Sequence, residues 1–176
     1  MSSLLGLEEE RAAADAASSY ENEQQAAQVR SGANWFYWIA VLSAINSLMY
    51  VFGSTVSFLA GLGFTQLADG FVDVAIENGV PTAVKGVAIA FDFILVAVFA
   101  FFGYYANKRS SAAFAVGIGI YVLDGLLLLL LGAFLSAGFH AFALFFIIRG
   151  FLACRTLNAQ TPASVFQTPP PPPSAI

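Results

Sequence analysis

Residues 111–157 read SAAFAVGIGIYVLDGLLLLLLGAFLSAGFHAFALFFIIRGFLACRTL. The stretch is almost entirely apolar, and a turn at Ser136 and Ala137 would divide it into two helices of similar length. Each half has about 19 to 25 residues, which is enough to cross a hydrocarbon core of about 30 Å at about 1.5 Å per residue. We therefore expect two membrane-spanning helices here, at about 112–135 and 137–155.

The composition of the whole chain is that of a membrane protein. Of its 176 residues, 59% are hydrophobic and only 10% are charged. A soluble domain of this length cannot bury so much apolar surface. Two further spans are expected at about 34–60 and 82–106, and the aromatic residues 35–38 suit a membrane interface. The predicted fold is an all-α membrane protein with four transmembrane helices in an antiparallel bundle.

Three segments are expected to lie outside these spans. Residues 1–31 form a polar N-terminal segment with six of the eleven acidic residues, predicting a solvated tail or a docking helix. Residues 64–78 alternate apolar and acidic positions at helical period, which predicts an amphipathic helix lying in the interface. Residues 158–176 contain five consecutive prolines and predict a Pro-rich disordered tail.

Basic residues near the ends of the spans predict the orientation of the chain. Arg30, Lys108, Arg109 and Arg155 fall on one side of a four-span topology, and Lys85 falls on the other. By the positive-inside rule, both termini are expected in the cytoplasm. We expect an integral protein of a bacterial inner membrane. Its partners would be the lipid bilayer and either a membrane-protein partner or a second copy in a homo-oligomer.

Three charged residues, Asp92, Asp124 and Arg149, fall within the expected spans. A charge at the bilayer centre costs about 2.5 to 3.5 kcal/mol on insertion scales, so these side chains should face protein or water. Asp124 precedes Ser136 by 12 residues and Arg149 follows Ala137 by 12 residues, which gives them the same depth in a hairpin. We expect an intramembrane charged network with an Asp124–Arg149 ion pair and Asp92 close in depth.

Two acids and one base do not neutralise one another. Either one carboxyl group is protonated, or a cation, a water cavity or the charge of a partner completes the set. Asn46 and His140 are secondary polar candidates. Asn46 lies on a stripe of small and hydroxylated residues, and His140 is expected near the external interface.

Several classes of function are excluded by missing residue patterns. The chain has one cysteine, Cys154, and one histidine, so it offers no zinc cluster and no pair of histidines for haem. Seven scattered basic residues give no footprint for nucleic acid. The Gly-x-Gly-Asp pattern of intramembrane aspartyl proteases fails, because Ile120 follows Gly119. We expect no cofactor, no metal and no catalytic activity.

The remaining expectation is a non-catalytic integral membrane protein that acts as a scaffold or accessory subunit of a membrane complex. Its N-terminal segment and Pro-rich tail would serve as handles. The alternative is a small oligomeric transporter or channel for protons or cations, in which the carboxylates of Asp92 and Asp124 line a shared cavity.

Overall fold

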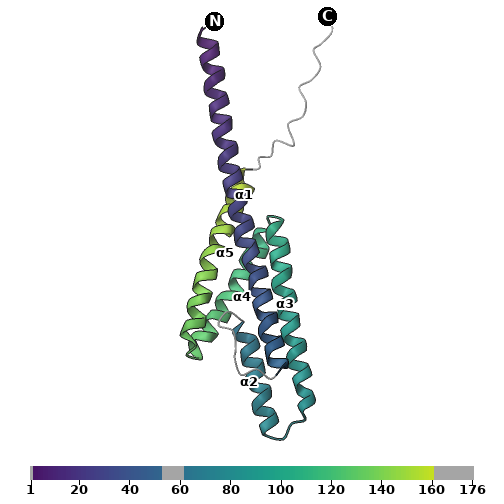
Figure 1. The fold of residues 1–176 in the computed structure, drawn as a ribbon. Coiled ribbons are helices and arrows are strands. Elements are labelled where there is room, and N and C mark those ends of the chain that lie inside the picture. Colours follow the sequence, from purple (N-terminus) through teal and green to yellow (C-terminus); the bar gives the residue numbers. More distant parts are fainter. Residues whose placement is uncertain (1, 53–61, 161–176) are drawn as a thin grey trace, which may run out of the picture.

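A computed structural model describes residues 2–52 and 62–160 of the chain. Every regular element in these ranges is helical, as Figure 1 shows. The elements are α1 (Ser2–Val51), α2 (Gly63–Glu77), a short 3-10 turn (Thr82–Val84), α3 (Lys85–Asn107), α4 (Ser111–Leu130) and α5 (Phe134–Gln160). Most of the predicted Pro-rich tail and the end of the first expected span lie outside the described residues.

Among the described residues, three helices are long and apolar enough to cross a membrane. They comprise α3 with the 3-10 turn that precedes it, α4 and α5, and they correspond to the spans predicted at 82–106, 112–135 and 137–155. At most 39% of the apolar window of each is buried within the protein. Large apolar side chains such as Val87, Leu130 and Phe145 face outward instead, as expected for helices surrounded by lipid.

The second half of α1 is not among these three candidate spans, although the sequence predicts a fourth span there. Its apolar character is diluted by Asn34, Ser43, Asn46 and Ser47. The last three of these side chains are buried and face the other helices. This half of α1 packs between α3 and α5 in Figure 1, while the first half continues out of the bundle as one unbroken helix.

The core of the bundle is aromatic. The ring of Phe36 is fully buried, with its centroid 5.9 to 6.3 Å from those of Phe99, Phe102 and Phe114. Gly117 leaves room for this ring, because a Cβ atom there would lie 2.6 Å from the Phe36 Cε1 atom. One of the four aromatic residues expected at the membrane interface is therefore a core residue.

The turn between α4 and α5 lies earlier than the sequence suggests. Helix α4 ends at Leu130, and α5 begins at Phe134, so the turn predicted at Ser136 and Ala137 is wrong. Gly132 adopts a φ of 75°, a left-handed conformation that glycine tolerates and that ends helices. This shift changes which residues of the two helices meet.

Helix α2 begins and ends within one residue of the predicted amphipathic helix, but its setting differs from a helix lying in the interface. Its first turn is inserted between other helices, where Gly63 and Thr65 are buried. It packs against α3 and α4 (Figure 1). The physical reason is a side chain of α4 that binds the start of α2, described below.

Helices α1 and α5 cross at two glycines. A Cβ atom on Gly32 would lie 2.7 Å from the Cα atom of Gly150. A Cβ atom on Gly150 would likewise lie 2.7 Å from the Cα atom of Gly32. Since the obstructing atoms belong to the backbone, they cannot rotate away. Close approach of two helix backbones at small residues is typical of packing in membranes.

Replacing Gly32 by alanine is expected to lower the free energy of unfolding in detergent by about 1 to 3 kcal/mol, the usual cost of overpacking. Gly119→Ala is the matched control, because it adds the same methyl group to a helix where nothing lies within 4 Å. Equal thermal unfolding midpoints for the two variants would contradict the close crossing.

Candidate functional site

A buried carboxylate connects three helices at the α2 end of the bundle. Asp124, on α4, is fully buried. Its oxygens accept hydrogen bonds from the backbone N–H groups of Gly63 and Phe64, each at 2.8 Å, and its Oδ2 atom lies 2.7 Å from Nε2 of His140. The two N–H groups belong to the first turn of α2, where the helix itself offers no acceptor. Asp124 therefore caps α2 from a neighbouring helix.

The hydrogen bonds of His140 fix the number of protons in this pair. Its Nδ1 atom lies 2.9 Å from the carbonyl oxygen of Ser136, which can only accept, so Nδ1 carries a hydrogen. One further proton is shared between Nε2 and Asp124. Whether it makes an imidazolium with a carboxylate or an imidazole with a carboxylic acid, the pair is neutral overall. Such a pair is tolerated in an apolar interior far better than a single charge.

Small residues and one aromatic ring shape the surroundings of the pair. A Cβ atom on Gly63 would lie 2.8 Å from Cγ of Leu128, so only glycine lets the start of α2 come this close. Tyr121 stacks on the His140 ring with a centroid distance of 4.3 Å. The Tyr121 hydroxyl group is buried and has no partner among the described residues.

Asp92, on α3, forms a second buried site with α1. Its Oδ2 atom lies 2.7 Å from Oγ of Ser47, which also lies 3.1 Å from the carbonyl oxygen of Ser43. A serine has one hydroxyl proton and can donate to only one of these oxygens. Both contacts are hydrogen bonds when Asp92 is a carboxylic acid that donates to Ser47. The geometry thus fits a neutral Asp92.

The two sites are joined through α1. The Ser43 hydroxyl oxygen accepts from the backbone N–H of Leu62 at 3.3 Å, and the next residue, Gly63, donates to Asp124. Ser43 therefore contacts both Ser47, the partner of Asp92, and the residue that precedes the capped turn of α2. Asn46 is buried on the same part of α1. Asp92 and Asp124 lie in two separate buried polar sites and do not touch each other directly.

A third carboxyl group adjoins Asp92 from α2. One oxygen of Asp69 and one of Asp92 are buried without a partner among the described residues. Helix α2 is not one of the candidate spans. Burial raises the pKa of Asp69, and the negative charge of Asp73 acts in the same direction, while Lys85 lowers it. The Asp69 carboxyl group therefore holds its proton more tightly than an exposed aspartic acid does.

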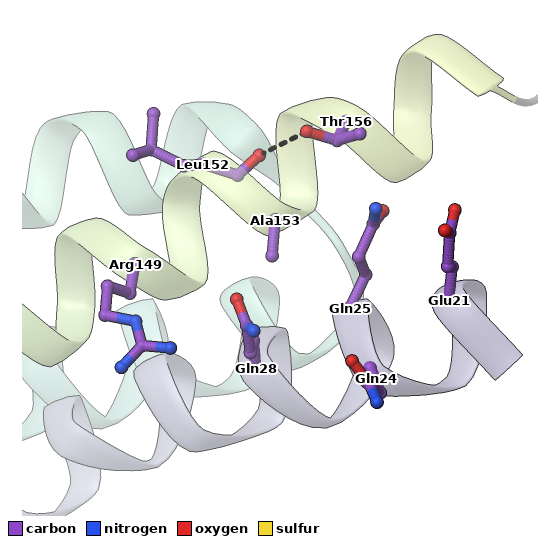
Figure 2. A pocket seen from close by; sticks show the side chains of 8 residues that line it. All are labelled: Glu21, Gln24, Gln25, Gln28, Arg149, Leu152, Ala153 and Thr156. Atoms are coloured by element: carbon purple, nitrogen blue, oxygen red, sulfur yellow. Dashed lines mark hydrogen bonds between the residues drawn. The ribbon is translucent and has the colours of Figure 1, made fainter.

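Arg149 does not belong to this network, so the predicted Asp124–Arg149 ion pair is wrong. The Arg149 side chain is exposed and lies in a groove between α1 and α5, beside Gln28 (Figure 2). Its guanidinium group sits over the ring of Phe145, 5.7 Å from the centroid. The carboxylate oxygens of Asp124 already have hydrogen-bond partners, which are His140 and the first turn of α2.

The position of the turn explains this error. With Gly132 at the turn, Asp124 lies eight residues before it and His140 eight residues after it, so these two have equal depth. Arg149 lies 17 residues after Gly132. The single histidine, expected near the external interface, is 1% exposed and takes the place assigned to the arginine.

Within the described residues, no three His, Cys, Asp or Glu side chains converge in a way that could hold a metal ion. The chemistry of the site is thus proton sharing and helix capping. No known protein family, curated protein or solved structure matches the chain.

Asp124→Ala is expected to destabilise the protein by about 3 to 5 kcal/mol, because it leaves the α2 N–H groups and His140 buried without their acceptor. The free energy of opening obtained from amide hydrogen exchange at Gly63 and Phe64 should fall by a similar amount.

Asp73→Ala is the control for this variant. Asp73 also lies on α2, but its side chain is half exposed and pairs with Lys85 at 3.4 Å, a surface contact worth at most about 1 kcal/mol. Unchanged exchange in the first turn of α2 in the Asp124→Ala protein would refute the capping role.

Proposed function

We propose that the protein is a non-catalytic integral membrane protein that acts as a scaffold or accessory subunit of a membrane complex. Its helical bundle is the anchor, and the first half of α1 is the element that a partner binds. Three candidate spans support the anchoring role. The buried ionisable groups also support the anchoring role, because Asp124 and His140 form contacts that hold helices together.

The observation that carries this proposal is the N-terminal arm, by which we mean residues 2–24 of α1. The side chains of residues 6–24 are all exposed, and the arm extends beyond the bundle in Figure 1, with Glu21 and Gln24 at its base lining a groove with α5. Helices in proteins owe most of their stability to packing, so an isolated polar helix is marginal in water. A partner that packs on the arm would supply the missing contacts.

The proposed topology adds the second half of α1 as a fourth span. The side-chain amides of Asn34 and Asn107 meet at 3.4 Å, which supports a common level for this part of α1 and the end of α3. Lys108 and Arg109 follow immediately in the chain. Under the positive-inside rule, that end and both termini are cytoplasmic, in the inner membrane of a bacterium.

Disrupting the arm is expected to release the partner while leaving the bundle intact. Ala13→Pro breaks the exposed helix, at a local cost of about 3 kcal/mol, and Ala13→Ser is the matched control that preserves it. In mild detergent, we expect the wild-type and Ala13→Ser proteins to migrate as a complex larger than the monomer, and Ala13→Pro as the monomer. The same migration for all three proteins would contradict the proposal.

A second candidate function, proton or cation transfer by an oligomer, is favoured by one observation. Asp69 and Asp92 each bury a carboxylate oxygen that has no partner among the described residues. A proton or a monovalent cation on each carboxyl group would satisfy these oxygens.

Reconstitution into proteoliposomes tests this second candidate. It predicts a proton or cation flux that Asp92→Asn abolishes, because the amide cannot release a proton. Glu77→Gln, at an exposed position of α2, should retain the flux. Absence of flux for protons, sodium and potassium in the wild-type protein would eliminate the candidate.

A further inference from the structure

A polar groove runs between α1 and α5 at the base of the N-terminal arm. It has a volume of about 420 Å³, and Figure 2 shows its side chains. Arg149 and Thr156 contribute from α5, and Gln25, Gln28 and Glu21 from α1. Arg149 and Glu21 lie at opposite ends of the row in Figure 2, with the glutamines between them. The groove thus offers a cation at one end followed by neutral hydrogen-bonding groups.

The cation in this groove lacks an acidic partner. No carboxylate of the described residues lies within 4.0 Å of Arg149, and its only close contact of note is the Phe145 ring on its own helix. The planar guanidinium group has five N–H donors in a geometry that matches phosphate oxygens. An anion with several oxygens is the complementary ligand.

The glutamines provide a second, independent feature. The Oε1 atom of Gln25 is buried and has no hydrogen-bond partner among the described residues. Buried polar atoms are nearly always paired, so an unpaired one in a groove marks a position for a ligand or water. An amide both donates and accepts, which suits hydroxyl groups. The two features together match a phosphate ester that carries hydroxyl groups.

The groove runs from the hydrocarbon core to the level of lipid headgroups. Arg149, at its deep end, is 15 residues from the start of α5, or about 22 Å along a hydrocarbon core of about 30 Å, whereas Thr156 is 22 residues or about 33 Å from that start. Below it, Trp35 stacks on Phe146 at a centroid distance of 5.3 Å. Above it, the side chains of residues 6–24 of α1 are exposed on all sides.

We propose that this groove binds the headgroup of an anionic phospholipid, with Arg149 on the phosphodiester oxygens and Gln25 and Gln28 on headgroup hydroxyl groups. Phosphatidylglycerol has this chemistry. The headgroup of a zwitterionic phospholipid carries an ammonium group, which would need an acidic partner near the phosphate. The acidic residue of the groove, Glu21, is too far away, because it lies seven residues from Gln28, about 10 Å along the helix. The inference rests on the membrane location and does not require the partner of the arm.

Arg155 provides a matched control on the same helix. Its guanidinium group lies 5.9 Å from the centroid of Phe151, four residues earlier, just as Arg149 lies 5.7 Å from Phe145. Arg155 does not line the groove. Arg149→Gln and Arg155→Gln therefore remove the same charge and the same ring contact, and only the first removes the proposed phosphate ligand.

Binding of phosphatidylglycerol and phosphatidylcholine with identical acyl chains to the full-length protein can be measured by native mass spectrometry. We expect the wild-type and Arg155→Gln proteins to prefer phosphatidylglycerol. Arg149→Gln should weaken its binding by about ten- to a hundred-fold, the loss typical of a charge-assisted hydrogen bond. Gln25→Leu should weaken binding of phosphatidylglycerol but not of phosphatidic acid, which lacks the headgroup hydroxyls.

Three results would overturn the proposal. The first is equal affinity of the wild-type protein for the two lipids. The second is an equal loss in Arg149→Gln and Arg155→Gln, which would indicate diffuse attraction to basic residues. The third is displacement of the lipid by glycerol 3-phosphate alone, which would identify a soluble phosphate ester as the ligand. A thermal unfolding midpoint of Arg149→Gln close to the wild-type value verifies that its fold is retained.

Discussion

The arrangement of the bundle at its α2 end depends on one buried carboxylate. Asp124 has no exposed surface, and an uncompensated charge there would cost several kcal/mol. It is compensated by two backbone N–H groups and one imidazole. Each donor comes with a structural requirement. The N–H groups require α2 to begin beside α4, and the imidazole requires the α4–α5 turn at Gly132.

The same arrangement separates structural from exchangeable groups. Both oxygens of Asp124 and both ring nitrogens of His140 have hydrogen-bond partners, so loss of a proton from this pair would weaken the helix contacts that it maintains. Asp92 and Asp69 differ, since each keeps one unpartnered buried oxygen. The two functional proposals therefore draw on different parts of the protein. Scaffolding uses the N-terminal arm and the filled pair, whereas proton transfer would use Asp69 and Asp92.

Much of the fold follows from local patterns in the sequence. Long apolar runs predicted the three candidate spans, and helical periodicity gave the limits of α2 within one residue. Burial of Asp92 and Asp124 followed from the cost of a charge in an apolar segment. The unbroken course of α1 was not predicted, because helix-forming residues before position 31 are equally compatible with a tail that is only partly helical.

The partner of Asp124 could not be found by matching charges. Two of its donors are backbone groups, which no side chain in the sequence marks. The third, His140, was missed because the turn was assigned to Ser136 and Ala137. The LGA sequence at 131–133, with glycine ending a helix, was the signal that would have identified it. An arginine in an apolar segment suggests an ion pair with a buried acid. The long side chain of Arg149 instead reaches the polar groove between α1 and α5.

A double-mutant cycle tests the identity of the Asp124 partner most directly. Free energies of unfolding would be measured for Asp124→Asn, His140→Gln, Arg149→Gln and the two double variants that contain Asp124→Asn. The structure predicts a coupling energy of about 1 to 3 kcal/mol between Asp124 and His140, and a value near zero between Asp124 and Arg149. The reverse result, coupling to Arg149 and none to His140, would contradict it.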